Sequence, residues 1–329
     1  MAWTAKRVVV TGAGGFIGSH LAEALVKAGA AVTAVVRYNS RGDDGSLRYL
    51  DSATRASLRI HRIDLADVDA TREALKGAEI VFNLAAFVGI PYSYASPHDA
   101  VMNNVVSTLN VLSVAREAGL EKLVQTSTSE VYGSARQLPI PETHPLQPQS
   151  PYSASKIATD NISLSYYYSF NLPVTLVRPF NTFGPRQSAR AVIPAVIAQA
   201  LAGSEIKIGS TTTTRDFTYV EDTVRGFMLA GESAAAIGEV VNIGTGRETS
   251  IADTIALILR GLGKEAQLVR DEHRVRPDKS EVSRLCADVG KAQRLMGYRP
   301  MVSLEDGLRR TSDWISAHLR EYRPEIYAT

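Results

Sequence analysis

Tyr152 and Lys156 are the most informative pair in the sequence, because they lie four residues apart. At this spacing in a helix, both side chains lie on one face, a single turn apart. A phenol has a pKa of about 10 and is a poor base at neutral pH, but a neighbouring ammonium favours the phenolate. The pair could therefore take a proton from an alcohol while a cofactor takes the hydride. The spacing also occurs by chance on solvated helix faces, so it needs support from elsewhere in the chain.

A glycine-rich turn near the N-terminus could hold a dinucleotide. Residues 8–18 pass from an apolar strand through a tight turn into a helix, with the spacing Gly-x-x-Gly-x-x-Gly rather than Gly-x-Gly-x-x-Gly. Gly12 permits the turn, Gly15 lets a pyrophosphate approach, and Gly18 allows close packing of helix on strand. The helix N-terminus then presents amides to the phosphates. We expect these cofactor contacts: Gly12, Gly15, Phe16, Ile17, Gly18, Arg37, Asn39, Ser40, Arg41, Asp64, Leu65, Leu84, Ala85, Ala86, Tyr152 and Lys156.

The residues after the second apolar run favour NADP over NAD. An NAD enzyme usually places an acidic residue there to bind the ribose hydroxyls, and none occurs before Asp43. Arg37, Ser40 and Arg41 suit a 2′-phosphate instead, because guanidinium pairs well with phosphate. The alternative is that both arginines are solvated loop charges and that the site accepts either cofactor.

Short apolar runs alternate with longer amphipathic stretches, a pattern that predicts an α/β fold with a doubly wound parallel (Rossmann) sheet. The runs are continuously apolar, as strands covered on both faces should be. The predicted strands are 7–11, 32–36, 58–63, 80–84, 123–126, 174–177 and 240–243. The predicted helices are 17–27, 70–76, 100–118, 152–168, 193–201, 221–230, 251–259, 287–295 and 304–319.

The pattern loosens after residue 180, where Pro and Gly become frequent. We therefore expect a dinucleotide-binding domain over 1–180 and a smaller mixed lobe for substrate over 181–329. The helix and strand within 221–243 are expected to return to the first domain.

Composition argues against several classes of protein. The formal net charge of +2 gives no reason to expect nucleic acid or an anionic membrane as a partner. Cys286 is the only cysteine, so no internal disulfide can form, and the six His residues form no ligand-spaced cluster, so we expect no metal. No apolar run approaches the roughly 20 residues of a membrane span. An apolar strand begins by Val8 and leaves no room for a signal peptide, so we expect a cytoplasmic protein.

The chain resembles the extended short-chain dehydrogenase/reductase family, and within it the branch that modifies nucleotide sugars. The resemblance spans nearly the whole sequence and rests on the glycine turn, 83–86, 127–133, Tyr152 with Lys156, 178–185, 215–217 and 276–277. The nearest likeness is to the retaining 4,6-dehydratases of legionaminic-acid-type pathways, which act on nucleotide-linked N-acetylglucosamine. That likeness rests on 90–94, 127–133, 186–194 and 276–282.

The resemblance implies that Tyr152 and Lys156 act on a sugar 4-hydroxyl, with Thr128 bound to its oxygen. Related 4-epimerases have no carboxylate at the position of Glu130, because epimerisation only removes and returns a hydride. A carboxylate is needed when a C5 proton must leave, so that the C6 hydroxyl departs as water and the hydride returns to C6. Ser129 replaces the Asp acid of glucose-nucleotide dehydratases. The implied catalytic set is Thr128, Ser129, Glu130, Tyr152 and Lys156.

Glu130 would then serve first as base and later, through Ser129 or water, as acid. Its alternative is a plain surface carboxylate. A 4-epimerase, a UDP-glucuronate decarboxylase-like enzyme and a catalytically silent dinucleotide sensor remain open, as does the nucleotide: UDP, GDP or another. The family also implies a homodimer through a four-helix bundle formed by 100–118 and 152–168. The expected substrate contacts are Ser93, Thr128, Asn181, Arg190, Arg215 and Arg276.

Overall fold

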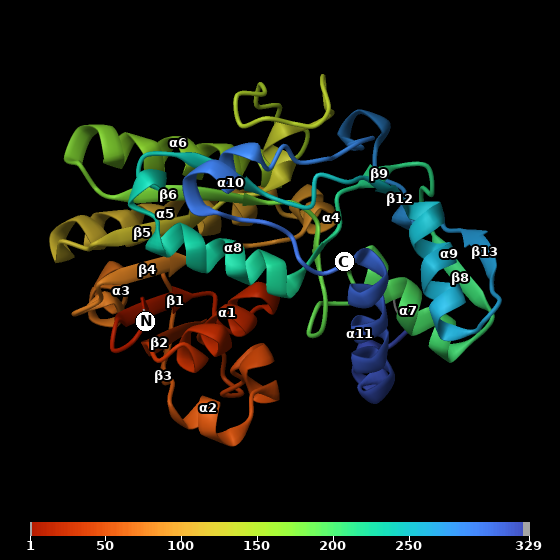
Figure 1. Ribbon diagram of the computed structural model, residues 1–329, viewed down its shortest axis with the longest axis horizontal. Helices are drawn as coiled ribbons and strands as arrows, with labels where there is room; N and C mark the ends of the chain where they lie inside the picture. Colours follow the sequence, from red (N-terminus) through yellow and green to blue (C-terminus); the bar gives the residue numbers. More distant parts are fainter. Residues whose placement is uncertain (1, 325–329) are drawn as a thin grey trace.

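A seven-stranded sheet forms the centre of the computed structural model, which describes residues 2–324 (Figure 1). Every neighbouring pair in the sheet is parallel, and the order is β3-β2-β1-β4-β5-β6-β11. The strands are β1 Arg7–Thr11, β2 Ala31–Arg37, β3 Arg59–Ile63, β4 Ile80–Asn83, β5 Lys122–Thr126, β6 Val174–Pro179 and β11 Val240–Ile243. The predicted doubly wound α/β fold is confirmed. The strand order reverses between β1 and β4, and ligands of such sheets bind in the crevice at this point.

Helices cover both faces of the sheet, because alternate residues of each strand are apolar on opposite sides. Val8 and Val10 of β1 belong to one core cluster and Val9 to another. The first face carries α1 Phe16–Lys27 and α8 Val220–Glu232, which pack side by side (Figure 1). The second face carries α3 Val68–Leu75, α5 Pro97–Ala118 and α6 Pro151–Phe170.

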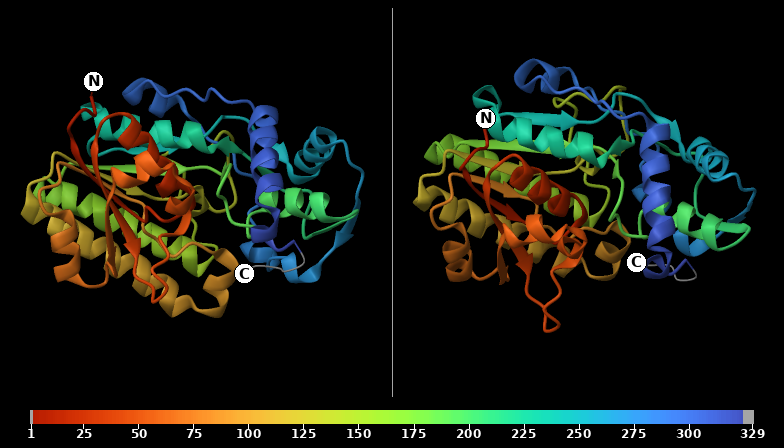
Figure 2. Two further views of the ribbon diagram at one scale, coloured as in Figure 1. Left: turned by 90° about the horizontal axis from the view of Figure 1, so that it is seen from below. Right: turned by 60° about the horizontal axis from the view of Figure 1, so that its bottom comes forward.

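A second group of elements lies at one end of the molecule, beyond the carboxyl ends of the strands (Figure 2). There α11 Leu304–Ala317 packs against α7 Val192–Ala202 and α9 Ile251–Leu262. Two further strands pair in parallel beside them, β8 Glu205–Ile208 and β13 Gln267–Arg270. The short elements are α2 Ser52–Ala56, α4 Ile90–Ala95, β7 Thr182–Phe183, β9 Thr214–Arg215, β10 Thr218–Tyr219, β12 Thr249–Ser250, α10 Gly290–Met296, α12 Leu319–Tyr322 and the 3₁₀ turn η2 Ser129–Tyr132.

The elements beyond the carboxyl ends of the strands share a hydrophobic core with the sheet and its helices. One core cluster runs from Val10 of β1 through Phe227 of α8 to Ile255 of α9 and Ile315 of α11. β11 pairs with β6, so the α8–β11 unit belongs to the sheet layers. The division into two lobes near residue 180 stays a prediction. Among the described residues, no helix combines the length and apolar character needed to cross a bilayer.

Candidate active site

The carboxyl ends of three adjacent strands are tied together by buried polar side chains. Strand register places Thr11, Asn83 and Gln125 beside one another. The Thr11 hydroxyl donates to Asn83 Oδ1 at 2.6 Å, and Asn83 Nδ2 donates to Gln125 Oε1 at 2.8 Å. The Ala85 amide donates to the same Thr11 hydroxyl at 3.1 Å. This ladder fixes the segment after β4 against the turn after β1, so two predicted cofactor segments meet.

The glycine turn has no room for side chains. Gly12 has φ +68°, and a Cβ there would lie 2.8 Å from the Ala85 nitrogen. A Cβ on Gly18 would lie 2.2 Å from the Gly12 carbonyl oxygen, and one on Gly15 would lie 3.2 Å from it. Within the described chain, no side chain caps the first turn of α1. Its free amides and the tight backbone therefore fit a pyrophosphate group.

The loop after β2 leaves its cationic side chains exposed. Arg37, Ser40 and Arg41 are exposed. Asn39 instead shapes the loop: its Oδ1 accepts hydrogen bonds from the amides of Arg41 at 3.1 Å and Asp43 at 3.0 Å. The predicted contact of Asn39 with a cofactor stays a prediction.

A buried carboxylate that the sequence reading missed anchors the same loop. Asp44 is buried and accepts from Arg62 Nε at 2.8 Å and from Arg55 Nη2 at 2.8 Å. The backbone beside it packs on Gly14, because the Ser46 amide donates to the Gly14 carbonyl at 2.8 Å. Residues 41–45 read Arg-Gly-Asp-Asp-Gly and do not indicate which arginines pair with Asp44, so only the tertiary structure reveals the pairing. The predicted cofactor residues Asp64 and Leu65 follow β3 next to this loop.

Tyr152 and Lys156 lie in the first two turns of α6 and are buried. The helix begins at Pro151 behind a capping box, in which Ser150 Oγ accepts from the Ser153 amide at 3.1 Å. Tyr152 is 7% exposed and is hydrogen-bonded to the Thr128 hydroxyl. Lys156 is 2% exposed, and its Nζ donates to the Thr126 carbonyl at 2.7 Å. The pair therefore packs against the end of β5 and the residues just after it.

Burial dominates the electrostatics of this pair. It raises the pKa of Tyr152 well above its ordinary value, the hydrogen bond from Thr128 opposes that rise, and the charge of Glu130 adds to it. Burial lowers the pKa of Lys156 to about 8, against the attraction of Asp160. The expectation that Lys156 brings the pKa of Tyr152 toward neutrality is wrong for the chain alone, because desolvation of the phenol outweighs it.

Glu130 lies close enough to the Tyr152 phenol and to Arg215 for its charge to act on both. It belongs to η2, and its amide donates to the capping Thr128 hydroxyl at 3.3 Å. Its charge acts on Tyr152 and also on Arg215 of β9. The neighbouring Ser129 is buried, whereas Glu130 is half-buried. The structure thus groups the predicted base, the predicted carboxylate and one predicted substrate arginine.

Several predicted substrate residues border the same region. Arg215 is buried and forms an ion pair with Glu281 at 3.2 Å, and Arg276 lies 3.9 Å from the same carboxylate. Asn181 Oδ1 and Arg276 Nη1 are buried atoms that find no hydrogen-bond partner among the described residues. Buried polar atoms are normally paired, so these two are available to a ligand.

The other two predicted substrate residues have internal partners. Arg190 is exposed, and its Nη1 donates to the Val88 carbonyl at 3.2 Å. Ser93 is fully buried and donates to the Ile90 carbonyl in its own helix at 2.7 Å. The contact of Ser93 with a hexose stays a prediction.

Asn104 on α5 is a positioning residue that the sequence reading missed. Its Oδ1 accepts from the Phe87 amide at 2.6 Å, and its Nδ2 donates to the Ser155 hydroxyl at 2.8 Å. Ser155 in turn donates to the Tyr152 carbonyl at 2.7 Å. The buried face of α5 also holds Ser107 and Thr108, so the sequence carries no clear signal for the role of Asn104. Asn104 links the segment after Ala86 to the helix that carries the proton-transfer pair.

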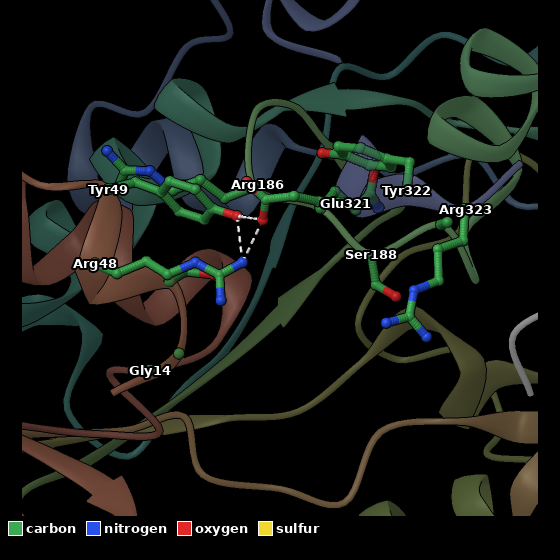
Figure 3. A pocket seen from close by; sticks show the side chains of 12 residues that line it. Gly14, Arg48, Tyr49, Arg186, Ser188, Glu321, Tyr322 and Arg323 are labelled. Carbon is green, nitrogen blue, oxygen red and sulfur yellow. Dashed lines mark hydrogen bonds and ion pairs between the residues drawn. The ribbon is translucent and has the colours of Figure 1, made fainter. Parts of the chain in front are cut away.

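A cavity of about 470 Å³ lies beside the glycine turn (Figure 3). Gly14, Ser46, Arg186 and Ser188 are among the residues that line it. Arg48 contacts the hydroxyl of Tyr49 and the carboxylate of Glu321 within it, as the dashed lines show (Figure 3). Its lining includes neither Tyr152 nor Lys156. The cavity therefore adjoins the cofactor end and is separate from the reaction centre. In residues 2–324, no cluster of His, Cys, Asp and Glu has the makings of a metal site.

Comparison with known proteins assigns the family. Residues 9–311 match the family described as GDP-mannose 4,6 dehydratase. The UDP-glucuronate 4-epimerase of Thermodesulfobacterium geofontis is 33% identical over 315 residues, which cover 93% of this chain and 95% of that protein. The dTDP-glucose 4,6-dehydratase of Streptomyces griseus is 33% identical over 329 residues, which cover 98% and 97%.

A solved structure has the same architecture. DesIV, the dTDP-glucose 4,6-dehydratase of Streptomyces venezuelae with NAD bound, is 31% identical and superposes with a TM-score of 0.87 over 97% of this chain and 99% of its own. The chain therefore belongs to the GDP-mannose 4,6 dehydratase family of extended short-chain dehydrogenases/reductases. It is an enzyme of the group that includes nucleotide-sugar dehydratases and epimerases.

Proposed function

We propose that this enzyme is a 4,6-dehydratase of a nucleotide-linked hexosamine, with UDP- or GDP-N-acetylglucosamine as the preferred candidates. The observation that supports it most is the position of Glu130. Its charge acts on the Tyr152 phenol and on Arg215. A hydride shuttle needs no carboxylate there, whereas removal of a C5 proton does.

The chain's own residues would carry the proton transfers. Tyr152 takes the proton of the sugar 4-hydroxyl while its hydrogen bond with Thr128 orients the phenol. The resulting C4 ketone acidifies the C5 hydrogen, which Glu130 removes as a proton. The C6 hydroxyl then leaves as water with a proton from Glu130, relayed by Ser129 or a water molecule. Oxidation at C4 and reduction at C6 balance, so no net oxidant is consumed.

The residues around the glycine turn fit a nicotinamide dinucleotide, because a Cβ on Gly15 or Gly18 would fill the space against Gly12. When bound, such a cofactor would accept the C4 hydride, return it to C6, and favour the phenolate through its positive ring. The exposed Arg37 and Arg41 support NADP as the preferred form, with NAD as the alternative.

The nucleotide diphosphate would lie across the second group of elements. Arg215 and Arg276 supply charge, and Asn181 supplies an unpaired buried acceptor. Arg190 would exchange its bond to Val88 for a phosphate oxygen. We also expect a cytoplasmic homodimer with no nucleic-acid or membrane partner.

A nucleotide-sugar 4-epimerase is the second candidate, because an epimerase relative matches this chain as closely as a dehydratase does, at 33% identity each. Such an enzyme would share the Tyr152 step and leave Glu130 without a role in proton transfer. A UDP-glucuronate decarboxylase-like activity also remains among the alternatives.

Replacing Glu130 with Gln separates the candidates. In a dehydratase the variant loses about 100-fold or more of its water elimination, the usual contribution of a general acid–base. It also accumulates reduced cofactor, seen as absorbance at 340 nm. Glu239→Gln is the matched control, because Glu239 pairs with Lys291 at the opposite ends of the strands. Full turnover by the Glu130→Gln variant would contradict the role of Glu130.

A further inference from the structure

Three residues at helical spacing on α6 contact three consecutive residues, of which the first ends β5 and the next two follow it. Tyr152 is hydrogen-bonded to Thr128, and Lys156 donates to the Thr126 carbonyl at 2.7 Å. Asp160, one turn further along, accepts from the Ser127 hydroxyl at 2.8 Å. Positions i, i+4 and i+8 share a helix face. The three contacts therefore fix the register of α6 against the end of β5.

Asp160 is also half of a buried ion pair. Arg178 of β6 donates to Asp160 Oδ2 from Nη2 at 2.9 Å and from Nε at 3.1 Å. The two side chains are 4% and 2% exposed, respectively. Asp160 Oδ1 is buried and finds no hydrogen-bond partner among the described residues. The carboxyl group is thus buried and only partly hydrogen-bonded.

Arg178 extends the network to the segment that carries Glu130. Its Nη1 donates to the Tyr132 hydroxyl at 3.0 Å, and that hydroxyl donates to Asn242 Oδ1 at 2.7 Å. Tyr132 is the last residue of η2 and is fully buried. The ion pair therefore connects the helix that holds the phenol to the turn that holds the carboxylate.

We propose that the Asp160–Arg178 ion pair positions the two halves of the reaction centre and holds Lys156 in its ammonium form. The proposal rests on the proposed function only in that Tyr152 and Lys156 perform alcohol chemistry. It assigns Asp160 and Arg178 no contact with substrate, so they are positioning residues.

A gain in folding stability does not account for the presence of this buried ion pair. Replacing a buried ion pair by apolar residues is often neutral or stabilising. Here the charge lies one turn from Lys156, whose ammonium has also been taken out of water. Burial lowers the pKa of Lys156, and the charge of Asp160 opposes that shift. Burial also raises the pKa of Asp160 above its ordinary value, and the charge of Arg178 is the largest effect that opposes this rise.

The charges around Lys156 come from three elements. Tyr152 and Asp160 lie on α6, Arg178 approaches from β6, and Glu130 acts on Tyr152 from η2. β5 contributes the neutral Thr126 carbonyl. Asp160 is therefore the group that favours the charged form of Lys156, and Arg178 partly neutralises Asp160.

The test is the alkaline limb of the pH profile of kcat/KM, measured on full-length holoenzyme with whichever product the wild type makes. Asp160→Asn should move that limb to lower pH by about one unit, because Lys156 loses its stabilising charge. Arg178→Met should move the alkaline limb to higher pH, because the charge of Asp160 then acts on Lys156 without the opposing charge of Arg178. In the double variant Asp160→Asn/Arg178→Met, the alkaline limb should lie near its wild-type pH. Shifts in the same direction, or lower activity with an unmoved limb, would overturn the proposal.

Unfolding in urea between pH 6 and pH 10 gives a readout that needs no turnover, so failure of the proposed function leaves this test standing. A lysine with a lowered pKa in the folded state makes stability rise with pH above that pKa. The rise should begin at lower pH in Asp160→Asn and at higher pH in Arg178→Met. Asp222→Asn is the matched control, because Asp222 is a buried carboxylate paired with Arg225 on α8. The control should lose stability without a change in the pH at which stability begins to rise. An equal change of that pH in the control would also overturn the proposal.

Discussion

At the scale of single residues, the reaction centre is held in a state that costs stability. Lys156 is buried with one carbonyl acceptor, and its pKa falls from 10.5 to about 8. Tyr152 is buried beside Glu130, and its pKa rises. The pKa of each group is thus shifted in the direction that disfavours its charged form. Strained electrostatics of this kind are common where function requires charge in a dry site.

Lys156→Met should stabilise the protein and abolish its activity. The folded-state pKa lies below the unfolded value, so the penalty is fully present below pH 8 and disappears as pH rises toward 10.5. The pKa shift of Lys156 corresponds to a destabilisation of about 3 kcal/mol that the variant removes. Loss of the hydrogen bond to the Thr126 carbonyl offsets about 1–3 kcal/mol of this gain. We expect a net gain of about 1 kcal/mol at pH 7 by urea unfolding.

Lys122→Met provides the matched comparison for that variant. Lys122 is also buried, its Nζ donates to the Ser233 carbonyl at 2.7 Å, and burial lowers its pKa to about 8. It lies at the start of β5, away from the reaction centre. Both variants should gain stability, and only Lys156→Met should lose activity. A stability loss in both at pH 7 would show that the hydrogen bonds outweigh the burial of charge.

Cofactor choice is argued from Arg37, an exposed residue at the end of β2. Arg37→Asp should reduce the affinity of the enzyme for NADP relative to NAD by at least tenfold, because a carboxylate repels a 2′-phosphate and accepts hydrogen bonds from the ribose hydroxyls. Binding titrations with both cofactors measure the ratio. An unchanged ratio would mean that Arg37 is a solvated loop charge and that the NAD seen in DesIV is the better guide.

At the scale of elements, α6 is the part whose placement matters most, because both proton-transfer residues lie in its first two turns. Its N-terminus is fixed by a reciprocal cap: the Ser150 amide donates to Ser153 Oγ at 3.0 Å, and the Ser153 amide donates back at 3.1 Å. Loss of this cap would let the first turn, and the phenol within it, move.

Ser150→Ala should therefore lower stability by about 1 kcal/mol and also reduce kcat several-fold. Ser303→Ala removes an equivalent cap from α11, where Ser303 Oγ accepts from the Asp306 amide at 3.1 Å. It should lose similar stability with no change in kcat. Thermal melts and initial rates for the two variants separate helix stability from positioning. Equal effects on kcat would mean that the cap acts through global stability alone.

The main elements could be predicted from sequence because their periodicity is long and clear. Each predicted strand coincides with a strand of the sheet, and the glycine turn separates β1 from α1 as expected. The elements α4, β8 and β13 were missed. α4 spans six residues, less than two helical turns, and β8 and β13 are largely exposed, so they lack the continuous apolar run of a strand buried on both faces. The predicted helix over 287–295 begins only at Gly290.

The reaction centre was only partly predictable. Spacing identified Tyr152 and Lys156 as candidates, and the family resemblance added Glu130. The Asp160–Arg178 pair was invisible, because its partners lie on a helix and a strand that only the fold brings together. The direction of the pKa of Tyr152 was wrong because sequence does not report burial. Asn104 likewise acquires its role from contacts with Phe87 and Ser155.

At the scale of the whole molecule, α5 and α6 pack against each other and carry apolar side chains at the surface. Val101, Met102 and Leu109 of α5 are exposed, as are Tyr168 and Phe170 of α6. We expect this face to form the four-helix dimer. Leu109→Glu should convert the dimer to a monomer in analytical ultracentrifugation, because it would place charge in the interface. A wild-type monomer at micromolar concentration would contradict the expected assembly.

The central claim is that this enzyme removes water from its sugar, and the product tests it most directly. UDP-N-acetylglucosamine, with GDP- and TDP-linked sugars in parallel, should be incubated with the holoenzyme and analysed by mass spectrometry and NMR. The account predicts a product lighter by one water with a new C6 methyl signal, and the substrate that reacts names the nucleotide. A product of unchanged mass with inverted C4 would contradict the account and identify a 4-epimerase.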